Sequence, residues 1–228
     1  MKSVKKYKHL FFDLDHTLWD FDSNALETLR ELFNTYQLNK KITSFSSFIQ
    51  TYQNVNKLLW QYYHRNEVDK ETLRYARFAL TLQDFDIDDI ALAKRIADDY
   101  ISISPYKGKL FPGAIETLDY LHEKYSMHLI TNGFKEVQHI KIKTSGLADY
   151  FDQIFISEEI GIMKPDIGIF KYALEKVQCK KTDAIMIGDS IEADIIGASN
   201  AGIDTVYFNP LKSEDRKSTR LNSSHVSE

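Results

Sequence analysis

The sequence predicts an α/β protein in which helices flank a parallel sheet and one all-helical block is inserted. Two observations predict this architecture. From about residue 104 onward, short apolar runs typical of buried strands alternate with stretches of helical periodicity. Before them, residues 22–102 show helical spacing of apolar residues and contain neither Pro nor Gly. Because strands that alternate with helices pair in parallel, the helical block is an insertion after the first strand.

Length and composition exclude several classes of protein. The 228 residues fit one large domain or a core with an insertion. The net charge of -4 argues against a nucleic-acid binder that works by neutralising phosphates. No apolar run approaches the ~20 residues that span a bilayer, so we expect no membrane partner. The single cysteine, Cys179, excludes an internal disulfide and a multi-cysteine zinc site, and we expect a cytoplasmic protein.

The first strand ends in an unusual group of polar residues. An apolar, aromatic run up to Phe12 is followed by Asp13, Asp15 and Thr17. A buried carboxylate needs a partner or a metal, and functional crevices of open α/β sheets lie at the carboxyl ends of strands. Taken alone, the stretch fits two interpretations equally: a site, or a strand end with solvated acids and a turn at Thr17.

The inserted block reads as roughly four helices, about the size of a small bundle. Apolar residues recur at helical spacing, for example Leu26, Leu29, Leu32 and Phe33. Ser44 and Asp69 are expected helix N-caps. We place the block at residues 19–103, between core segments 1–18 and 104–212.

The rest of the core alternates regularly. Helices are expected at 114–125, 135–145, 166–177 and 191–201, and strands at 127–130, 153–156, 184–187 and 205–208. Gly146 is the expected C′ residue of the second of these helices, and Gly202 ends the last one. Residues 213–228 are polar and Ser-rich, so we expect a disordered or foreign tail.

Polar residues follow the later strands as well. Thr131 and Asn132 follow the second strand, Lys164 lies beyond the third, and Asp189 and Asp194 follow the fourth. Each has an ordinary explanation in isolation, such as a surface lysine or a helix N-cap. Together, in this order on successive strands, they are expected to converge on one edge of the sheet.

The chemistry of this set suits a phosphate ester. Asp13 and Asp189 offer oxygen ligands for Mg²⁺, which also keeps waters and a substrate phosphate. Lys164 and Thr131, with backbone N–H groups near Asn132, suit phosphate oxygens. A carboxylate beside such charges can attack phosphorus, and a second one can protonate the leaving oxygen and then deprotonate water.

Four segments carry a family resemblance. FFDLDHTL at 11–18, LITNG at 129–133, GIMKPDIGIF at 161–170 and IGDSIEADIIGA at 187–198 resemble the four motifs of the haloacid dehalogenase-like hydrolase superfamily. The resemblance implies a Rossmann-like parallel sheet, and the helical block is similar to a type-one cap, a mobile lid. We therefore expect the cap to close over the substrate and exclude water.

The resemblance also implies roles for the motif residues. Asp13 would be the nucleophile, and Asp15 the general acid/base whose backbone carbonyl also meets Mg²⁺. Thr131 and Lys164 would bind phosphate, with Asn132 beside them. Asp189 would bind Mg²⁺, while Thr17 and Asp194 would support the site. The second acid, Asp15, favours a phosphatase over a dehalogenase.

A closer resemblance involves segments of both the core and the cap. The segments at 15–23, 55–60, 130–134 and 156–161 resemble those of house-cleaning pyrimidine 5′-nucleotidases, which dephosphorylate nucleoside monophosphates. Phe21, Asn56, Trp60 and Arg77 are then candidates to face the base. The alternative is packing inside the cap, which a helical stripe of large residues also predicts. For Arg77 we favour the functional interpretation, because a basic residue on a buried face needs a partner.

Other functions stay open at this point. One is a phosphatase of another small phosphate, such as phosphoglycolate or a sugar phosphate, because specificity lies in the cap. A second is a phospho-acceptor protein without turnover, which needs neither Asp15 nor a lid. Family members usually continue past the last strand with a further strand and helix, so we expect one sheet edge to lack cover. The sequence does not separate a monomer from a dimer.

Overall fold

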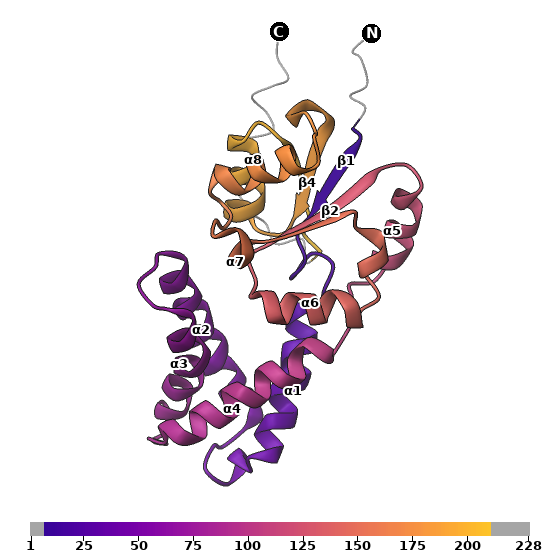
Figure 1. Cartoon of the computed structure of the whole chain (residues 1–228). Helices are drawn as coiled ribbons and strands as arrows, with labels where there is room; N and C mark the ends of the chain where they lie inside the picture. The colour runs from indigo at the N-terminus through magenta and orange to yellow at the C-terminus, as the bar shows by residue number, and fades with distance from the viewer. Residues whose placement is uncertain (1–6, 211–228) are drawn as a thin grey trace. The chain divides into compact units, whose positions relative to one another are not determined.

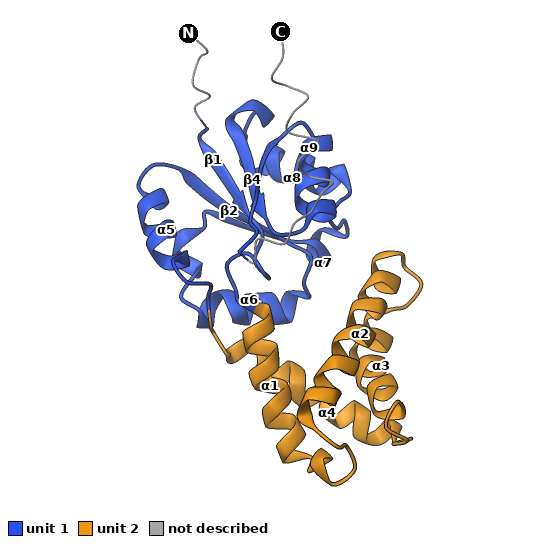
Figure 2. Ribbon diagram, turned by 180° about the vertical axis from the view of Figure 1, so that it is seen from behind, with its two compact units in different colours: residues 1–20, 110–228 blue, residues 21–109 orange. Residues whose placement is uncertain are grey.

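The computed structural model describes residues 7–210, so the predicted tail at 213–228 lies outside the described residues. The chain divides into two compact units (Figure 2). Within the described part, unit 1 comprises residues 7–20 and 110–210, and unit 2 is Phe21–Lys109. The sequence predicts residues 19–103 for the inserted segment.

A parallel sheet forms the centre of unit 1 (Figure 1). Its strands lie in the order β3-β2-β1-β4-β5. Every neighbouring pair is parallel, which confirms the predicted fold class. The central position of β1 brings the acids that follow it to the middle of one sheet edge. The strands are β1 His9–Phe12, β2 Ser126–Thr131, β3 Gln153–Ile156, β4 Ala184–Gly188 and β5 Asp204–Tyr207.

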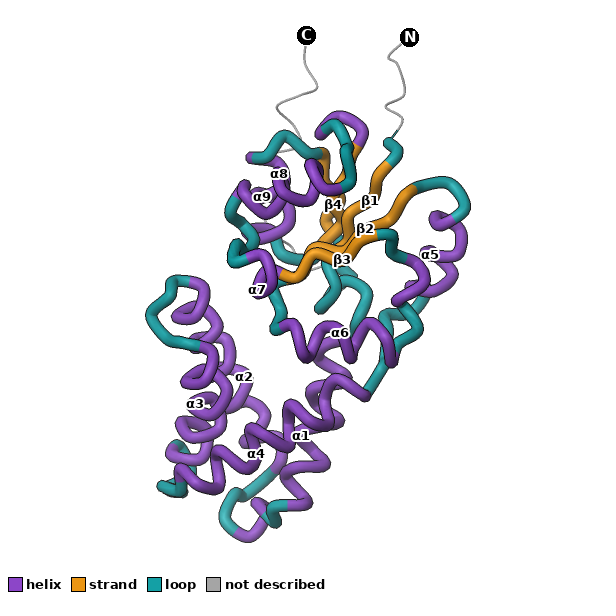
Figure 3. The backbone as a smooth tube through the Cα atoms, in the orientation of Figure 1, coloured by secondary structure: helices purple, strands orange, loops and turns teal. Residues whose placement is uncertain are grey.

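Helices cover both faces of this sheet. Helices α8 and α9 lie on one face and α5 on the other (Figure 3). On the first face, Phe170 of α8 and Ala198 of α9 pack with Phe11 and Met186 of the sheet in a fully buried cluster. The helices of unit 1 are α5 Ala114–His122, α6 Lys135–Thr144, α7 Ser157–Ile160, α8 Ile167–Lys176 and α9 Gly197–Asn200.

The sequence predicts one helix at 191–201, but the structure has two helical segments of different types there. Its first part, η5, is a π-helical segment from Ile191 to Ile196, and only α9 is α-helical. The Ile195 backbone N–H donates to the Ser190 carbonyl at 3.2 Å, a wider closure than an α-helix makes. The Ser190 side chain caps this segment by accepting from the backbone N–H of Ala193. Sequence periodicity does not distinguish this turn from an α-helix.

Unit 2 consists of four α-helices and short 3₁₀ turns: α1 Phe21–Thr35, α2 Phe45–His64, α3 Lys70–Gln83 and α4 Ile90–Ile103. The predicted N-caps are confirmed, since the side chains of Ser44 and Asp69 accept from the backbone N–H groups of Ser47 and Thr72. Large apolar side chains from all four helices, including Phe33, form one core. Within residues 7–210, no helix combines the length and the hydrophobicity that a bilayer crossing requires.

In each unit, the segment by which the chain leaves and the segment by which it returns are joined by backbone or side-chain hydrogen bonds. In unit 1, Trp19 and Leu110 form an antiparallel bridge, and the Phe111 backbone N–H donates to the Leu18 carbonyl at 2.9 Å. In unit 2, the fully buried amide of Asn24 donates to the Lys109 carbonyl at 2.8 Å and accepts from its N–H at 3.1 Å. The outgoing and returning segments therefore lie side by side in both units.

Candidate active site

A tight turn after β1 folds Thr17 back onto the acids. The Leu14 carbonyl accepts from the backbone N–H groups of Leu18 and Trp19, both at 2.9 Å. His16 takes the left-handed conformation, with φ of 64°, that the reversal requires. As a result the Thr17 hydroxyl lies 3.2 Å from an Asp13 carboxylate oxygen and 3.3 Å from one of Asp189. This turn joins the ends of β1 and β4.

Lys164 lies between two acids and is only 2% exposed. Its Nζ is 2.7 Å from Asp13 Oδ1 and 2.5 Å from Asp194 Oδ1. The Asn132 side-chain amide fixes the lysine backbone, donating to its carbonyl and accepting from its N–H, both at 2.8 Å. Lys164 is therefore a buried, rigidly held cation, and its neighbouring acids raise its pKa although burial acts in the opposite direction.

Asp194 is held from two sides. One carboxylate oxygen contacts Lys164, and the other accepts from the backbone N–H of Ser190 at 3.0 Å. Gly188 makes room for it, since a Cβ at that position would lie 2.3 Å from Asp194 Oδ2. The π-helical turn and this glycine together bring the acid, 1% exposed, against the end of β4.

Three carboxylates form a cluster that could hold a metal ion. Oxygens of Asp13, Asp189 and Asp194 lie within 4.8 Å of one another. Burial, and then the negative charges around them, raise the pKa of both Asp13 and Asp189. With Lys164 as counter-charge, these three acids retain two negative charges when ionised. Oxygen ligands with that excess charge, two of them from buried acids, fit a hard divalent cation such as Mg²⁺.

The second acid of the pair, Asp15, has different partners. Its Oδ1 is 2.6 Å from Lys141 Nζ, and its Oδ2 accepts from Gln138 Nε2 at 2.8 Å. Burial alone would raise the pKa of Asp15, but the charge of Lys141 and the hydrogen bonds from Lys141 and Gln138 outweigh it and lower the pKa. The Asp15 carboxylate is thus outside the three-acid cluster, and the expected contact of its backbone carbonyl with Mg²⁺ stays a prediction.

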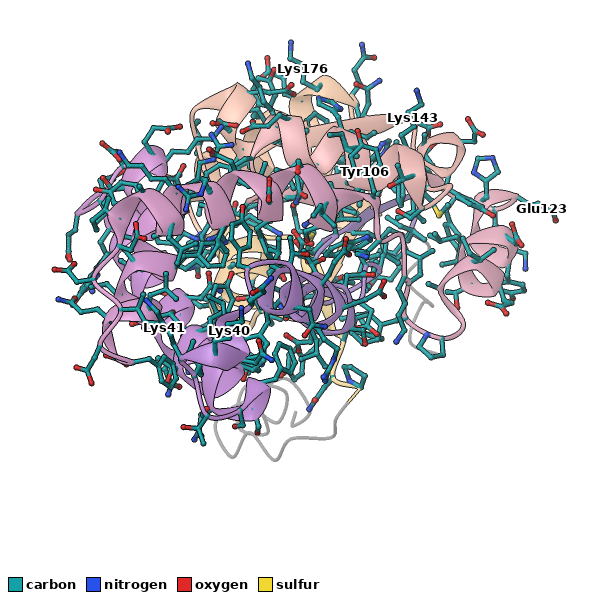
Figure 4. All side chains as sticks on the ribbon, turned by 90° about the horizontal axis from the view of Figure 1, so that it is seen from below. Lys40, Lys41, Tyr106, Glu123, Lys143 and Lys176 are labelled. Carbon is teal, nitrogen blue, oxygen red and sulfur yellow. The ribbon has the colours of Figure 1, made fainter. Side chains whose placement is uncertain are left out.

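Gln138 and Lys141 are site residues that the sequence analysis missed. Both lie on the buried face of α6, which Ile142 completes. A signal was available, since positions 138, 141 and 142 share one helix face and two of them are polar. Lys143 shows the contrast: it is exposed on the same helix, and Figure 4 shows it at the edge of the molecule.

Thr131 ends β2 and is 1% exposed. Its hydroxyl oxygen accepts from Gln138 Nε2 at 2.6 Å, so its own proton is left to donate to another group. The Asn132 amide is used by Lys164, as described above, which leaves the backbone as the part of Asn132 suited to an anion. The positions of both residues agree with a phosphate subsite at this edge of the sheet.

The remaining candidates belong to unit 2. Arg77 is 6% exposed, and its guanidinium lies 4.7 Å from the Tyr100 ring centroid and 5.3 Å from that of Phe78. These contacts favour the packing interpretation for Arg77. Trp60 is half-buried on α2 and contacts the Tyr63 ring edge to face. The Asn56 side-chain oxygen is buried and has no hydrogen-bond partner among residues 7–210.

Two relatives are similar to this chain over most of its length. The chain is 33% identical over 205 residues to the pyrimidine 5′-nucleotidase YjjG of Escherichia coli, covering 90% of this chain and 87% of the relative. It is 35% identical over 208 residues to the pyrimidine 5′-nucleotidase PynA of Streptococcus pneumoniae, covering 90% and 84%.

A solved structure is similar along nearly the whole chain. The crystal structure of the putative HAD-hydrolase YfnB from Bacillus subtilis bound to magnesium matches with a TM-score of 0.83 and 28% identity, over 92% of each chain. The profile of the family described as haloacid dehalogenase-like hydrolase matches residues 10–208, which include all four strand-end motifs. The chain therefore belongs to the haloacid dehalogenase-like hydrolase family.

Proposed function

We propose that this protein is a Mg²⁺-dependent phosphomonoesterase that hydrolyses nucleoside 5′-monophosphates, with pyrimidines preferred, through an aspartyl-phosphate. One observation carries the proposal: Asp13 lies 2.7 Å from the buried cation Lys164 and shares Thr17 with Asp189. Phosphoryl transfer depends chiefly on positioning and on neutralising charge, and this arrangement offers both.

In the first step, a carboxylate oxygen of Asp13 attacks phosphorus and the bond from phosphorus to the leaving oxygen breaks. Lys164 and the Thr131 hydroxyl donate to phosphate oxygens, and the proton of Asp15 moves to the leaving oxygen. Mg²⁺, held by Asp13 and Asp189, would supply charge neutralisation at the transferring group. The products of this step are the nucleoside and a phosphorylated Asp13.

In the second step, a water oxygen attacks phosphorus and the bond to Asp13 breaks. Asp15, which gave its proton to the leaving oxygen in the first step, is ionised and accepts a proton from that water. The step releases inorganic phosphate, restores the Asp13 carboxylate, and leaves on Asp15 the proton that the next leaving oxygen requires.

The pyrimidine preference rests on the two nucleotidase relatives and on unit 2. Both relatives match this chain over most of their length, unit 2 included. Trp60 offers a half-buried aromatic face and Asn56 an unpartnered amide oxygen, which are groups that recognise a base by stacking and hydrogen bonding. Arg77, buried among aromatic rings, would support these groups from inside the helical unit.

The experiment is phosphate release with Mg²⁺ from UMP, dUMP, dTMP, AMP, GMP, phosphoglycolate and several sugar phosphates, each with an EDTA control. We expect a pyrimidine monophosphate to lead by tenfold or more in kcat/KM, which is about 1.4 kcal/mol of transition-state discrimination. EDTA should abolish release, and added Mg²⁺ should restore it.

Two results would change the proposal. A lead for phosphoglycolate or a sugar phosphate would retain the phosphatase chemistry and overturn the substrate. A single stable phosphorylation of Asp13 without turnover would indicate a phospho-acceptor protein instead.

A further inference from the structure

Two buried polar residues of α6 contact the acid/base residue of the proposed mechanism. Gln138 is fully buried and Lys141 is 4% exposed. They lie three positions apart, so their side chains emerge from the same face of the helix. Burying a lysine costs free energy unless its charge is paired. Burying an amide costs free energy unless it forms hydrogen bonds. Two apolar side chains at positions 138 and 141 would avoid the free-energy cost of removing polar groups from water, so a reason is needed for the polar pair.

The contacts fix Asp15 at two points. Lys141 Nζ holds Oδ1 at 2.6 Å and Gln138 Nε2 holds Oδ2 at 2.8 Å, so each carboxylate oxygen has its own donor. Two separate donors define the plane of the carboxyl group as well as its position. Lys141 is fixed in turn by Trp19, because its Nζ lies 4.1 Å from the centroid of the fully buried indole ring.

Gln138 also links Asp15 to the phosphate subsite. The same Nε2 donates to the Thr131 hydroxyl oxygen at 2.6 Å. The amide therefore sets the distance between the acid/base and a proposed phosphate ligand. Gly133 makes the position possible, since a Cβ there would lie 2.2 Å from Gln138 Nε2. The glycine of the Thr131-Asn132-Gly133 segment is thus required by the amide that packs against it.

We propose that Gln138 and Lys141 are positioning residues that hold the Asp15 carboxyl group for proton transfer to the leaving oxygen and from the attacking water. The inference rests on the proposed function, because it assigns Asp15 that role. Neither residue forms or breaks a bond in the reaction. Their contribution is to fix where the Asp15 carboxyl group lies relative to the leaving oxygen, while Thr131 holds the phosphate.

The test compares leaving groups. A nucleoside leaves as a strongly basic alkoxide that needs a proton, whereas p-nitrophenolate leaves without one. The ratio kcat/KM reports only the steps up to departure of the leaving group, so later water attack does not affect it. The variants are Lys141→Met and Gln138→Met, and the matched control is Lys143→Met, which removes an exposed lysine from the same helix.

For UMP, or the best alkyl phosphate of the panel, we expect Lys141→Met to lower kcat/KM by about 10²-fold, as for loss of a general acid. For p-nitrophenyl phosphate, kcat/KM should stay within about threefold of wild type, while kcat falls and a burst of p-nitrophenolate appears. Gln138→Met also removes the donor to the Thr131 hydroxyl, so it should lower kcat/KM for both substrates but more for UMP, and Lys143→Met should lower neither. Adding Lys141→Met to Asp15→Asn should cost little more than Asp15→Asn alone.

Several outcomes separate this inference from the proposed function. If Lys141→Met lowers kcat/KM equally for both substrates, its role is merely structural and the inference is wrong. Full activity of both variants would also overturn the inference. If Lys141→Met does not fold, the smaller change Gln138→Met decides by its larger loss for UMP. If wild-type protein with Mg²⁺ hydrolyses neither substrate, the proposed function fails first, and the inference fails with it.

Discussion

Each acid of the Asp13–Asp15 pair has its own buried lysine. Lys164 contacts Asp13, and Lys141 contacts Asp15, at 2.7 and 2.6 Å. The surroundings still move the two pKa values apart: burial raises that of Asp13, whereas Lys141 and Gln138 lower that of Asp15. Two carboxyl groups with such different surroundings can take different roles in one reaction, although only one residue separates them.

Replacing the nucleophile gives the first prediction at this scale. Asp13→Asn should lower kcat for phosphate release by at least about 10³-fold, because an amide cannot form the acyl phosphate. The fold should be retained, since the Asn carbonyl oxygen can still accept from Lys164 Nζ. Steady-state phosphate release and far-UV circular dichroism measure the two effects. Unchanged release at matched purity would remove Asp13 from the mechanism.

The site residues were predictable to different degrees. Lys164 follows a strand within a recognisable motif, so the sequence placed it at the edge of the sheet. Lys141 and Lys143 both lie on α6, yet one is buried and the other exposed. Residue type does not show which of the two lysines is buried. Lys141 is buried because it contacts Asp15, which is 126 positions away in the chain.

At the scale of elements, the junction of β4 and η5 determines where Asp194 lies. Gly188 ends the strand, and the π-helical turn from Ile191 to Ile196 carries the acid back over it. Neither feature is visible in an apolar pattern, since a π-helical turn and an α-helix bury similar positions over six residues. The short helix α7, Ser157–Ile160, escaped prediction because four residues show no periodicity.

Replacing Gly188 with alanine tests whether this junction places Asp194. In Gly188→Ala the new Cβ would meet the Asp194 side chain at 2.3 Å, which displaces the partner of Lys164. We expect a loss of about 2 kcal/mol in unfolding free energy and at least about tenfold in kcat. Chemical denaturation and phosphate release measure these effects.

Gly113→Ala is the control for this substitution. It introduces strain at a φ of 80° but meets no atom within 4 Å, so it should keep its activity. Wild-type stability and activity in Gly188→Ala would show that Asp194 can move without cost.

At the scale of the whole molecule, the sheet contains a histidine pair made of the partly buried His9 and the buried His128. His9 Nδ1 and His128 Nε2 share a hydrogen bond of 3.0 Å between β1 and β2, and the rings stack. Burial, and then the neighbouring His9, lower the pKa of His128 to about 4. The pair is therefore neutral in the folded protein at neutral pH.

This pair makes stability depend on pH. Between pH 6.5 and about 4 the unfolded chain protonates His128 and the folded chain does not, so stability falls as the pH falls through that window. His128 is 2% exposed, and we expect a loss of about 2 kcal/mol between pH 7 and pH 4.5. Urea denaturation of wild type and His128→Leu at each pH isolates this contribution. Parallel pH curves for the two proteins would contradict it.

The hydrogen-bonded segments at which the chain leaves and re-enters unit 1 have a consequence for the evolution of such a protein. The chain leaves unit 1 after Asp20 and re-enters it at Leu110, and Trp19 and Leu110 are bridged to each other within unit 1. A helical unit of any length that begins and ends at neighbouring points can be exchanged there without altering the register of β1. The proposed chemistry of the acids and the proposed choice of substrate by unit 2 would thus be encoded in separately replaceable stretches of the gene.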